Sequence, residues 1–176
     1  MTQELLDLRN SITEGRYEDA LVLIDELEGM SRQVILRNIQ SFLLRLLMHL
    51  IKNQIEQRLT KSWAASIRYS IRHSIRQIKK LNLQDNKISY YIKTDEWQTM
   101  LEDEFEAAIR DASLEVRDGS YSESELLEMV DREQILLTAQ TFLALTYEYS
   151  VRELPGVVNE YLAQLPGGED WKQGRQ

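Results

Sequence analysis

Cysteine is absent from the 176-residue chain, and only 2 prolines and 7 glycines are present. The absence of cysteine excludes disulfide bonds, thiolate metal sites and cysteine nucleophiles. A β-sheet protein of this length needs many tight turns, and these counts supply too few of the residues that form them. We therefore expect an all-α fold, an antiparallel bundle of about seven to eight helices around a central apolar helix.

Long uninterrupted hydrophobic runs are also missing. The longest apolar stretch, residues 42–51, contains Arg45 and His49 and is too short to span a bilayer. Near the start of the chain, Glu4, Asp7 and Arg9 interrupt any segment that could serve as the apolar part of a signal peptide. We expect a cytoplasmic protein that does not engage a membrane.

No recognisable catalytic or metal-binding pattern is present. The two histidines, His49 and His73, belong to different predicted helices and to no metal-binding spacing, and the chain has no glycine-rich phosphate loop or nucleophile elbow. The acidic clusters at residues 25–28 and 102–106 are expected to face solvent, because neighbouring carboxylates on a helix point in different directions. We expect no enzyme, catalytic residue, cofactor or metal; an enzyme that uses His49 is the least favoured alternative.

Charge is divided unevenly along the chain, whose net charge is −8. Residues 1–31 contain 2 basic and 8 acidic side chains, and residues 81–176 contain 8 basic and 20 acidic ones. Between them, residues 32–80 contain 11 basic side chains and a single acid, Glu56. This segregation indicates either neutralisation within the folded chain or a charged binding surface.

Hydrophobic periodicity and capping residues predict the helices. Gly15 is expected to cap the first helix and Gly29 to end the second, while Ser122 with Glu125 forms a capping box and Pro155 begins the last helix. The predicted helices cover residues 3–13, 17–28, 31–59, 62–81, 95–116, a segment from 122, 132–150 and 155–165. We expect a bundle domain over residues 5–115, a helical extension over 120–166 that packs on it, and a frayed tail over 167–176.

A Ser-Ile-Arg-x tetrad occurs three times in succession over residues 66–77. A repeat of four residues on a helix produces one apolar and one basic stripe, and both stripes rotate by roughly 40° with each repeat. The apolar stripe contains Trp63, Ile67, Ile71, Ile75 and Ile78, which we expect to pack on the central helix. The basic stripe contains Lys61, Arg68, Arg72, Arg76 and Lys79.

The basic stripe has two interpretations. With Tyr69 and His73 on an adjacent face, it could bind the phosphates of a nucleic acid. Alternatively, it pairs with the acidic helix predicted over residues 95–116, whose segment 95–115 contains 8 acids and 1 base. We favour internal pairing, because a chain with a pI near 4.9 repels nucleic acid at long range.

Three sequence blocks resemble an uncharacterised bacterial family, common in cyanobacteria, known as domain of unknown function twenty-nine. They are residues 23–32, the leucine-rich run of residues 46–52 that contains His49, and Ser62-Trp63 followed by Ile67-Arg68. The resemblance covers roughly residues 5 to 110 and departs at Asn53, where the family often has an aromatic residue. It implies an all-helical fold, supplies no activity or cofactor, and draws attention to His49 and Trp63.

The sequence thus favours a non-enzymatic interaction or regulatory module that self-associates or holds a protein partner. The alternative is a nucleic-acid-associated protein that uses the basic stripe, with Lys61, Arg68, Arg72, Arg76 and Lys79 on phosphates.

Overall fold

The computed structural model describes residues 1–56, 61–84 and 86–165, with side chains described from Ser66 onward in the second of these ranges. The described residues form an all-α fold, as predicted, and contain one isolated β-bridge, between Leu83 and Tyr90, but no β-sheet. The α-helices and short 3-10 helices (η) are α1 Gln3–Thr13, α2 Tyr17–Glu56, α3 Lys61–Asn82, η1 Thr94–Glu96, α4 Trp97–Glu115, η2 Val116–Gly119, α5 Glu123–Met129, α6 Arg132–Glu148 and α7 Leu154–Leu162.

Three of the predicted helix boundaries are confirmed by their capping geometry. Gly15 adopts a φ of 74° after α1, and the N–H groups of Gly15 and Arg16 donate to the carbonyls of Ile12 and Ser11, which is the Schellman arrangement. At the start of α5, the Ser122 hydroxyl accepts the Glu125 N–H, and the Glu125 carboxylate accepts the Ser122 N–H. Pro155 lies in the first turn of α7.

The predicted break at Gly29 is wrong, because α2 runs without interruption from Tyr17 to Glu56. A glycine inside a helix costs only about 1 kcal/mol relative to alanine, which the surrounding leucines and glutamates can tolerate. Gly15 differs from Gly29 because only Gly15 has a positive φ and a set of capping hydrogen bonds. The predicted helices over residues 17–28 and 31–59 are therefore one element as far as Glu56, and the predicted end over residues 57–59 lies outside the described residues.

The chain divides into two compact units, residues 1–38 and residues 39–176, with the division inside α2. The predicted boundary between residues 115 and 120 falls within the second unit, which contains α3 to α7 together. The predicted tail over residues 167–176 lies outside the described residues.

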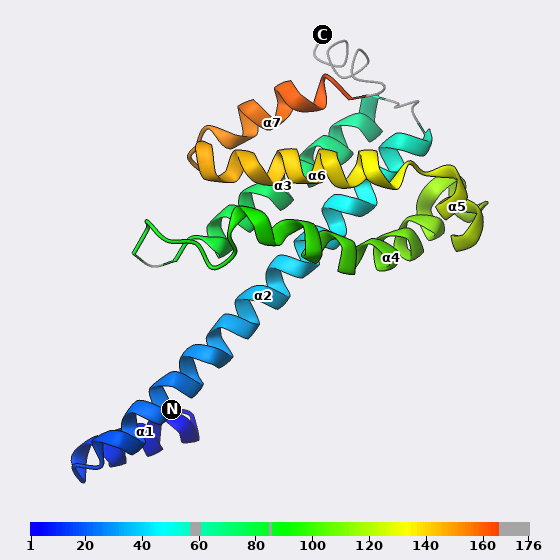
Figure 1. Cartoon of the computed structure of the whole chain (residues 1–176). Coiled ribbons are helices and arrows are strands. Elements are labelled where there is room, and N and C mark those ends of the chain that lie inside the picture. Colours follow the sequence, from blue (N-terminus) through cyan, green and yellow to red (C-terminus); the bar gives the residue numbers. More distant parts are fainter. Residues whose placement is uncertain (57–60, 85, 166–176) are drawn as a thin grey trace. The chain divides into compact units, whose positions relative to one another are not determined.

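The second unit has an extensive apolar core. In Figure 1, α6 lies between α4 and α7, and both helices contact it; α3 packs against α6 and α7. The T-shaped contact between Phe42 and His73, with ring centroids 5.9 Å apart, joins α2 to α3. The buried apolar side chains that α2 and α3 contribute to this core are Ile39, Leu43, Leu46, Leu47, Leu50, Ile51, Ile67, Ile71, Ile75 and Ile78. Trp63 is predicted to belong to the apolar stripe of α3, but its side chain lies outside the part of the chain that the structure describes.

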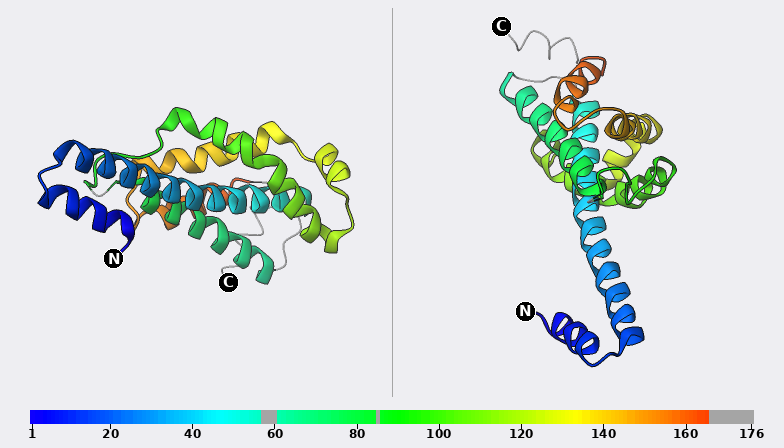
Figure 2. Two further views of the ribbon diagram at one scale, coloured as in Figure 1. Left: turned by 90° about the horizontal axis from the view of Figure 1, so that it is seen from below. Right: turned by 90° about the vertical axis from the view of Figure 1, so that its left-hand side faces the viewer.

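The first unit is a helical hairpin. Figure 2 shows the chain reversing direction between α1 and the first turns of α2. Only Ser11 and Ala20 are buried among its residues, and residues of both helices line an open groove. The expected apolar face of α2 is only partly covered: Leu23 and Leu27 are half-buried, and Ile24 is exposed.

α2 is also long and apolar enough, by length and composition alone, to cross a bilayer. The core helices of globular domains often meet this criterion too. After residue 38, six apolar side chains of α2 are buried in the second unit: Ile39, Leu43, Leu46, Leu47, Leu50 and Ile51.

Candidate functional site

The basic stripe of α3 does not form one continuous surface. Arg76 is exposed and Arg72 is half-buried beside it, whereas Arg68 is half-buried and makes an interaction within the chain. Lys79 is buried. The side chain of Lys61 lies outside the described residues. Of the five predicted residues, the structure thus brings Arg72 and Arg76 together on the surface.

Lys79 points into the second unit, contrary to its predicted place on a binding face. Its ammonium group donates to the Thr146 carbonyl of α6 and, at 3.2 Å, to the Tyr90 hydroxyl. Lys79 follows Ile75 by four residues and Ile71 by eight, so the rotation of the stripes carries it toward the isoleucine side. The methylene groups of Lys79 can be buried at this position because its ammonium group has two hydrogen-bond acceptors.

The predicted ion pairs between the basic stripe and α4 are not found for Arg72 and Arg76 in the part of the chain that the structure describes. Among the described residues, no carboxylate lies within 4 Å of the Arg72 or Arg76 guanidinium group. The main neighbours of α3 are α6 and α7, and most acids of α4 are exposed. Neutralisation by α4 therefore does not account for these two charges.

His49 lies in the part of α2 that belongs to the second unit, and its side chain is half-buried there. Burial lowers the pKa of His49 to about 4; Lys52 adds to this effect, Glu115 opposes it and Arg45 contributes in the same direction as Lys52. The imidazole is therefore neutral at pH 7, and its Nδ1 is buried without a hydrogen-bond partner in the described part of the chain. A neutral, weakly basic ring without an orienting partner has the character of a core histidine.

Beside His49, a partly buried ion pair joins α2 to α4. The Lys52 ammonium lies 2.6 Å from a carboxylate oxygen of Glu115, and the Lys52 side chain is 7% exposed against 51% for Glu115. One turn later, a carboxylate oxygen of Glu56 accepts the backbone N–H of Arg117 at 3.0 Å. These two contacts hold the end of α2 against the end of α4 and the start of η2. Lys52, Glu56 and Glu115 therefore have a structural role here.

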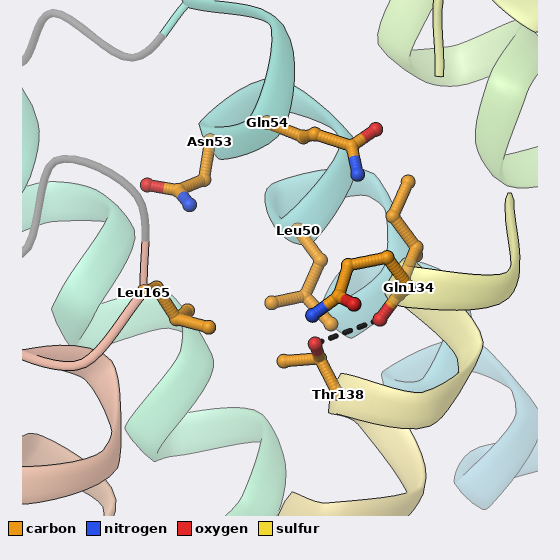
Figure 3. Close-up of a pocket in the computed structure, with 7 residues that line it drawn as sticks. Leu50, Asn53, Gln54, Gln134, Thr138 and Leu165 are labelled. Atoms are coloured by element: carbon orange, nitrogen blue, oxygen red, sulfur yellow. Dashed lines mark hydrogen bonds between the residues drawn. The ribbon is translucent and has the colours of Figure 1, made fainter. Parts of the chain in front are cut away.

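A small cavity lies beside the last turns of α2, between this helix and α6 (Figure 3). Leu50, Asn53, Gln134 and Thr138 contribute to its lining, and the Thr138 hydroxyl donates to the Gln134 carbonyl at 2.8 Å. Its volume of about 30 Å³ suits a water molecule and no organic substrate. Asn53 is buried, and its Oδ1 has no hydrogen-bond donor among the described residues.

The described residues contain no group of three or more histidine or acidic side chains arranged to hold a metal ion. The acids of residues 25–28 and all but Glu104 of those at 102–106 are exposed, as expected for solvated helix faces. In the first unit, Arg16 pairs with Glu14 at 2.8 Å and with Asp19 at 2.9 Å across the turn between the helices.

The largest departure from the sequence prediction is an apolar surface on the first unit. Large hydrophobic side chains of both helices face solvent there, among them Leu21 at 61% exposure and Val34 at 55%. The sequence carried a signal for it, because the apolar residues of residues 17–38 spread over more of the helix than one buried stripe requires. The exposed set is Leu5, Leu6, Ile12, Tyr17, Leu21, Val22, Ile24, Met30 and Val34.

The chain is similar to a known protein family. A family described as a domain of unknown function, DUF29, matches residues 8–136. No curated protein and no solved structure matches the chain at a significant level. The matched segment includes all of α2, α3, α4 and α5, and it ends within α6, so α7 lies beyond it.

Proposed function

The chain belongs to the DUF29 family, whose description names no activity, and we propose from its own geometry that it is a self-associating helical module. Its first unit, residues 1–38, pairs with the same unit of a second copy. The observation that carries this proposal is the exposed apolar surface of the hairpin, whose two helices leave Leu6, Leu21, Met30 and Val34 in contact with solvent. Exposed apolar surface of this kind typically marks an interaction site.

The size of the unit supports association. Polypeptides of fewer than about 40 residues rarely fold alone without disulfides, metals or oligomerisation. The first unit has 38 residues, the chain has no cysteine, and only Ser11 and Ala20 are buried in it. A second copy that covers the exposed apolar side chains of the hairpin would supply the buried core that the unit lacks on its own.

The length of α1 leaves part of the α2 face uncovered. α1 has 11 residues, which corresponds to about 16 Å, and it is its last turn that lies next to the first turn of α2. Ala20, Leu23, Leu27, Met30 and Val34 follow one another at alternating spacings of three and four residues, the pattern of a helix-pairing seam. Met30 and Val34, at the far end of this seam, are the members that remain more than half exposed.

Charge favours a second copy in antiparallel orientation. In α2, residues 18–28 contain five acids, and Arg32 and Arg37 follow them; all seven side chains are exposed. A parallel pairing would place acids beside acids, which is unfavourable. An antiparallel pairing centred near residues 28–30 places the acidic turns of one copy beside Arg32 and Arg37 of the other.

Light scattering over a concentration series of the full chain tests the proposal. We expect a species of about twice the 20.7 kDa of one chain. Replacing Met30 and Val34 with serine should weaken the dimer about a hundredfold, since four partly exposed side chains lose their apolar contact in each dimer. The control replaces Leu114 and Leu137, residues of the second unit that are somewhat more exposed than Met30 and Val34, with serine and should leave the dimer intact.

Because the chain has no cysteine, single introduced cysteines can measure the relative orientation of the two paired α2 helices. A cysteine at Met30, close to the centre of the antiparallel pairing, should form a disulfide between copies under mild oxidation, because the two Cα atoms lie within reach. Cysteine at Val22, which is equally exposed on another side of α2, should not. Efficient linkage through a cysteine at Val34 would indicate parallel helices, and a strictly monomeric wild-type chain would contradict self-association itself.

The setting we propose for this module is the bacterial cytoplasm. The reasons are the chain's lack of cysteine and its acidic composition, which suits a protein kept in solution by its net charge of −8.

A further inference from the structure

One face of α3 carries an unusual combination of side chains. Tyr69, Arg72, His73 and Arg76 occur at positions i, i+3, i+4 and i+7, so they lie along the same side of the helix. Together with Pro155 from the first turn of α7, they line an open pocket of about 160 Å³. All five residues belong to the second unit, so this pocket is independent of the proposed self-association.

The two guanidinium groups of the pocket are not neutralised within the described part of the chain. No carboxylate pairs with Arg72 or Arg76 there, and the Arg72 Nε is buried without an acceptor. The acid closest to Pro155 in sequence, Glu153, is held locally, since it accepts the Ser150 N–H at 3.0 Å. Two arginines without a counter-charge among the described residues are suited to bind phosphate oxygens, which the planar guanidinium group recognises in bidentate fashion.

The aromatic residues of the pocket are already arranged for stacking. The Tyr69 and His73 rings stack with centroids 5.7 Å apart and an interplanar angle of 14°. His73 in turn contacts the Phe42 ring edge-on at 5.9 Å, which anchors the stack to α2. Tyr69 remains 62% exposed, so its ring is positioned from one side and open to a ligand. Planar bases stack on rings of this kind with about 1–3 kcal/mol per base.

We infer that this pocket binds a nucleotide, with its phosphate on Arg72 and Arg76 and its base on Tyr69. Tyr69 and Arg76 are seven residues apart, which along a helix is about 10 Å, a span that a single nucleotide can bridge. A free nucleotide is favoured over a nucleic-acid strand because the molecule carries a net charge of −8. Charges beyond the screening length of about 8 Å affect a small ligand little, whereas a long polyanion meets the acidic remainder of the chain.

Isothermal titration of the full chain with adenosine 5′-monophosphate tests the inference, with inorganic phosphate and adenosine as partial ligands. We expect adenosine monophosphate to bind more tightly than either part. The double substitution Arg72→Gln and Arg76→Gln should weaken its binding at least tenfold. Tyr69→Ala should weaken adenosine monophosphate about tenfold and leave the weaker binding of phosphate unchanged, because only the base contacts the ring.

The charge-matched control is the double substitution Lys80→Gln and Lys87→Gln, which removes two exposed positive charges outside the pocket. This control should bind as the wild type does, and circular dichroism should show that all variants remain helical. No binding of adenosine monophosphate at millimolar concentration, or equal losses in the control, would overturn the inference. Tighter binding of a 12-nucleotide oligouridine than of the mononucleotide, lost in the arginine double variant, would overturn the choice of a free nucleotide in favour of single-stranded nucleic acid.

Discussion

The two halves of α2 show how differently one helix can be used. Up to residue 38, several of its large apolar residues face solvent, as Leu21, Met30 and Val34 do; after it, Leu43, Leu47 and Ile51 are completely buried. Both halves are rich in leucine and isoleucine and have helical periodicity. An apolar helix face therefore shows that a partner is required, but not whether that partner lies in the same chain.

The two halves of α2 also differ in how far apart in sequence their hydrogen-bonded residues are. In the second half, Lys52 pairs with Glu115, Glu56 accepts the Arg117 N–H, and Gln54 exchanges hydrogen bonds with the backbone of Asp131 at 2.8 and 3.4 Å. In the first unit, the side-chain hydrogen bonds of Gln3, Thr13 and Arg16 join positions no more than four apart. The first half is thus organised locally and the second by tertiary contacts.

The largest expected effect is that of core truncation in the second half. Leu47→Ala should lower the free energy of unfolding by about 3–4 kcal/mol, because the side chain is fully buried and leaves a cavity. Leu21→Ala, at 61% exposure, should change it by no more than about 0.5 kcal/mol in the monomer. Urea unfolding at low protein concentration measures both, and equal losses would abolish the distinction between the two halves.

His49 should make the second half sensitive to acid. Its pKa is about 4 in the folded chain and near 6.5 when unfolded, so the unfolded state binds the proton first as pH falls. Stability present above pH 6.5 is then lost progressively down to about pH 4, by about 3 kcal/mol at most. His49→Gln should remove this part of the pH dependence, which unfolding curves of both proteins across that window would measure. An unchanged pH profile would contradict the burial of a neutral His49.

The ion pair between α2 and α4 gives a smaller effect. Glu115→Gln should cost about 2 kcal/mol, because Lys52 keeps its charge in a buried position after its carboxylate partner is removed. The control is Glu106→Gln, which changes an exposed acid of the same helix and should leave the unfolding midpoint in place. A similar loss in both variants would indicate an effect of net charge alone.

Glycine substitutions in the first unit have the smallest effects and opposite signs. Gly29→Ala should stabilise α2 locally by about 0.5–1 kcal/mol, since the position is helical and an added Cβ meets no atom within 4 Å. Gly15→Ala should destabilise the hairpin by about 1 kcal/mol, because its φ is 74°. Amide hydrogen exchange along residues 17–38 reports both changes, and slower exchange in the Gly15 variant would contradict the capping role.

Much of the fold could be predicted from local signals. The Schellman cap at Gly15 and the capping box at Ser122 depend on residues within one or two turns, so their sequence patterns are sufficient. Gly29 misled because a single glycine lowers helix propensity without terminating a helix when no capping residue or strained φ accompanies it.

The candidate site was only partly accessible from the sequence. The stripe pattern identified Arg72 and Arg76, and Tyr69 and His73 beside them. It could not predict that Lys79 donates to Thr146, because that acceptor is 67 residues away in sequence. Nor could it supply Pro155, which enters the pocket from α7.

The sequence by itself determined the helical class, most helix ends and the two rotating stripes of α3, since these depend on intrinsic propensity and on neighbours within a few residues. Only the tertiary structure decided which half of α2 lies in a core and which arginines keep an uncompensated charge. Burial and ion pairing depend on groups distant in sequence, and a helical pattern carries no information on where those groups lie.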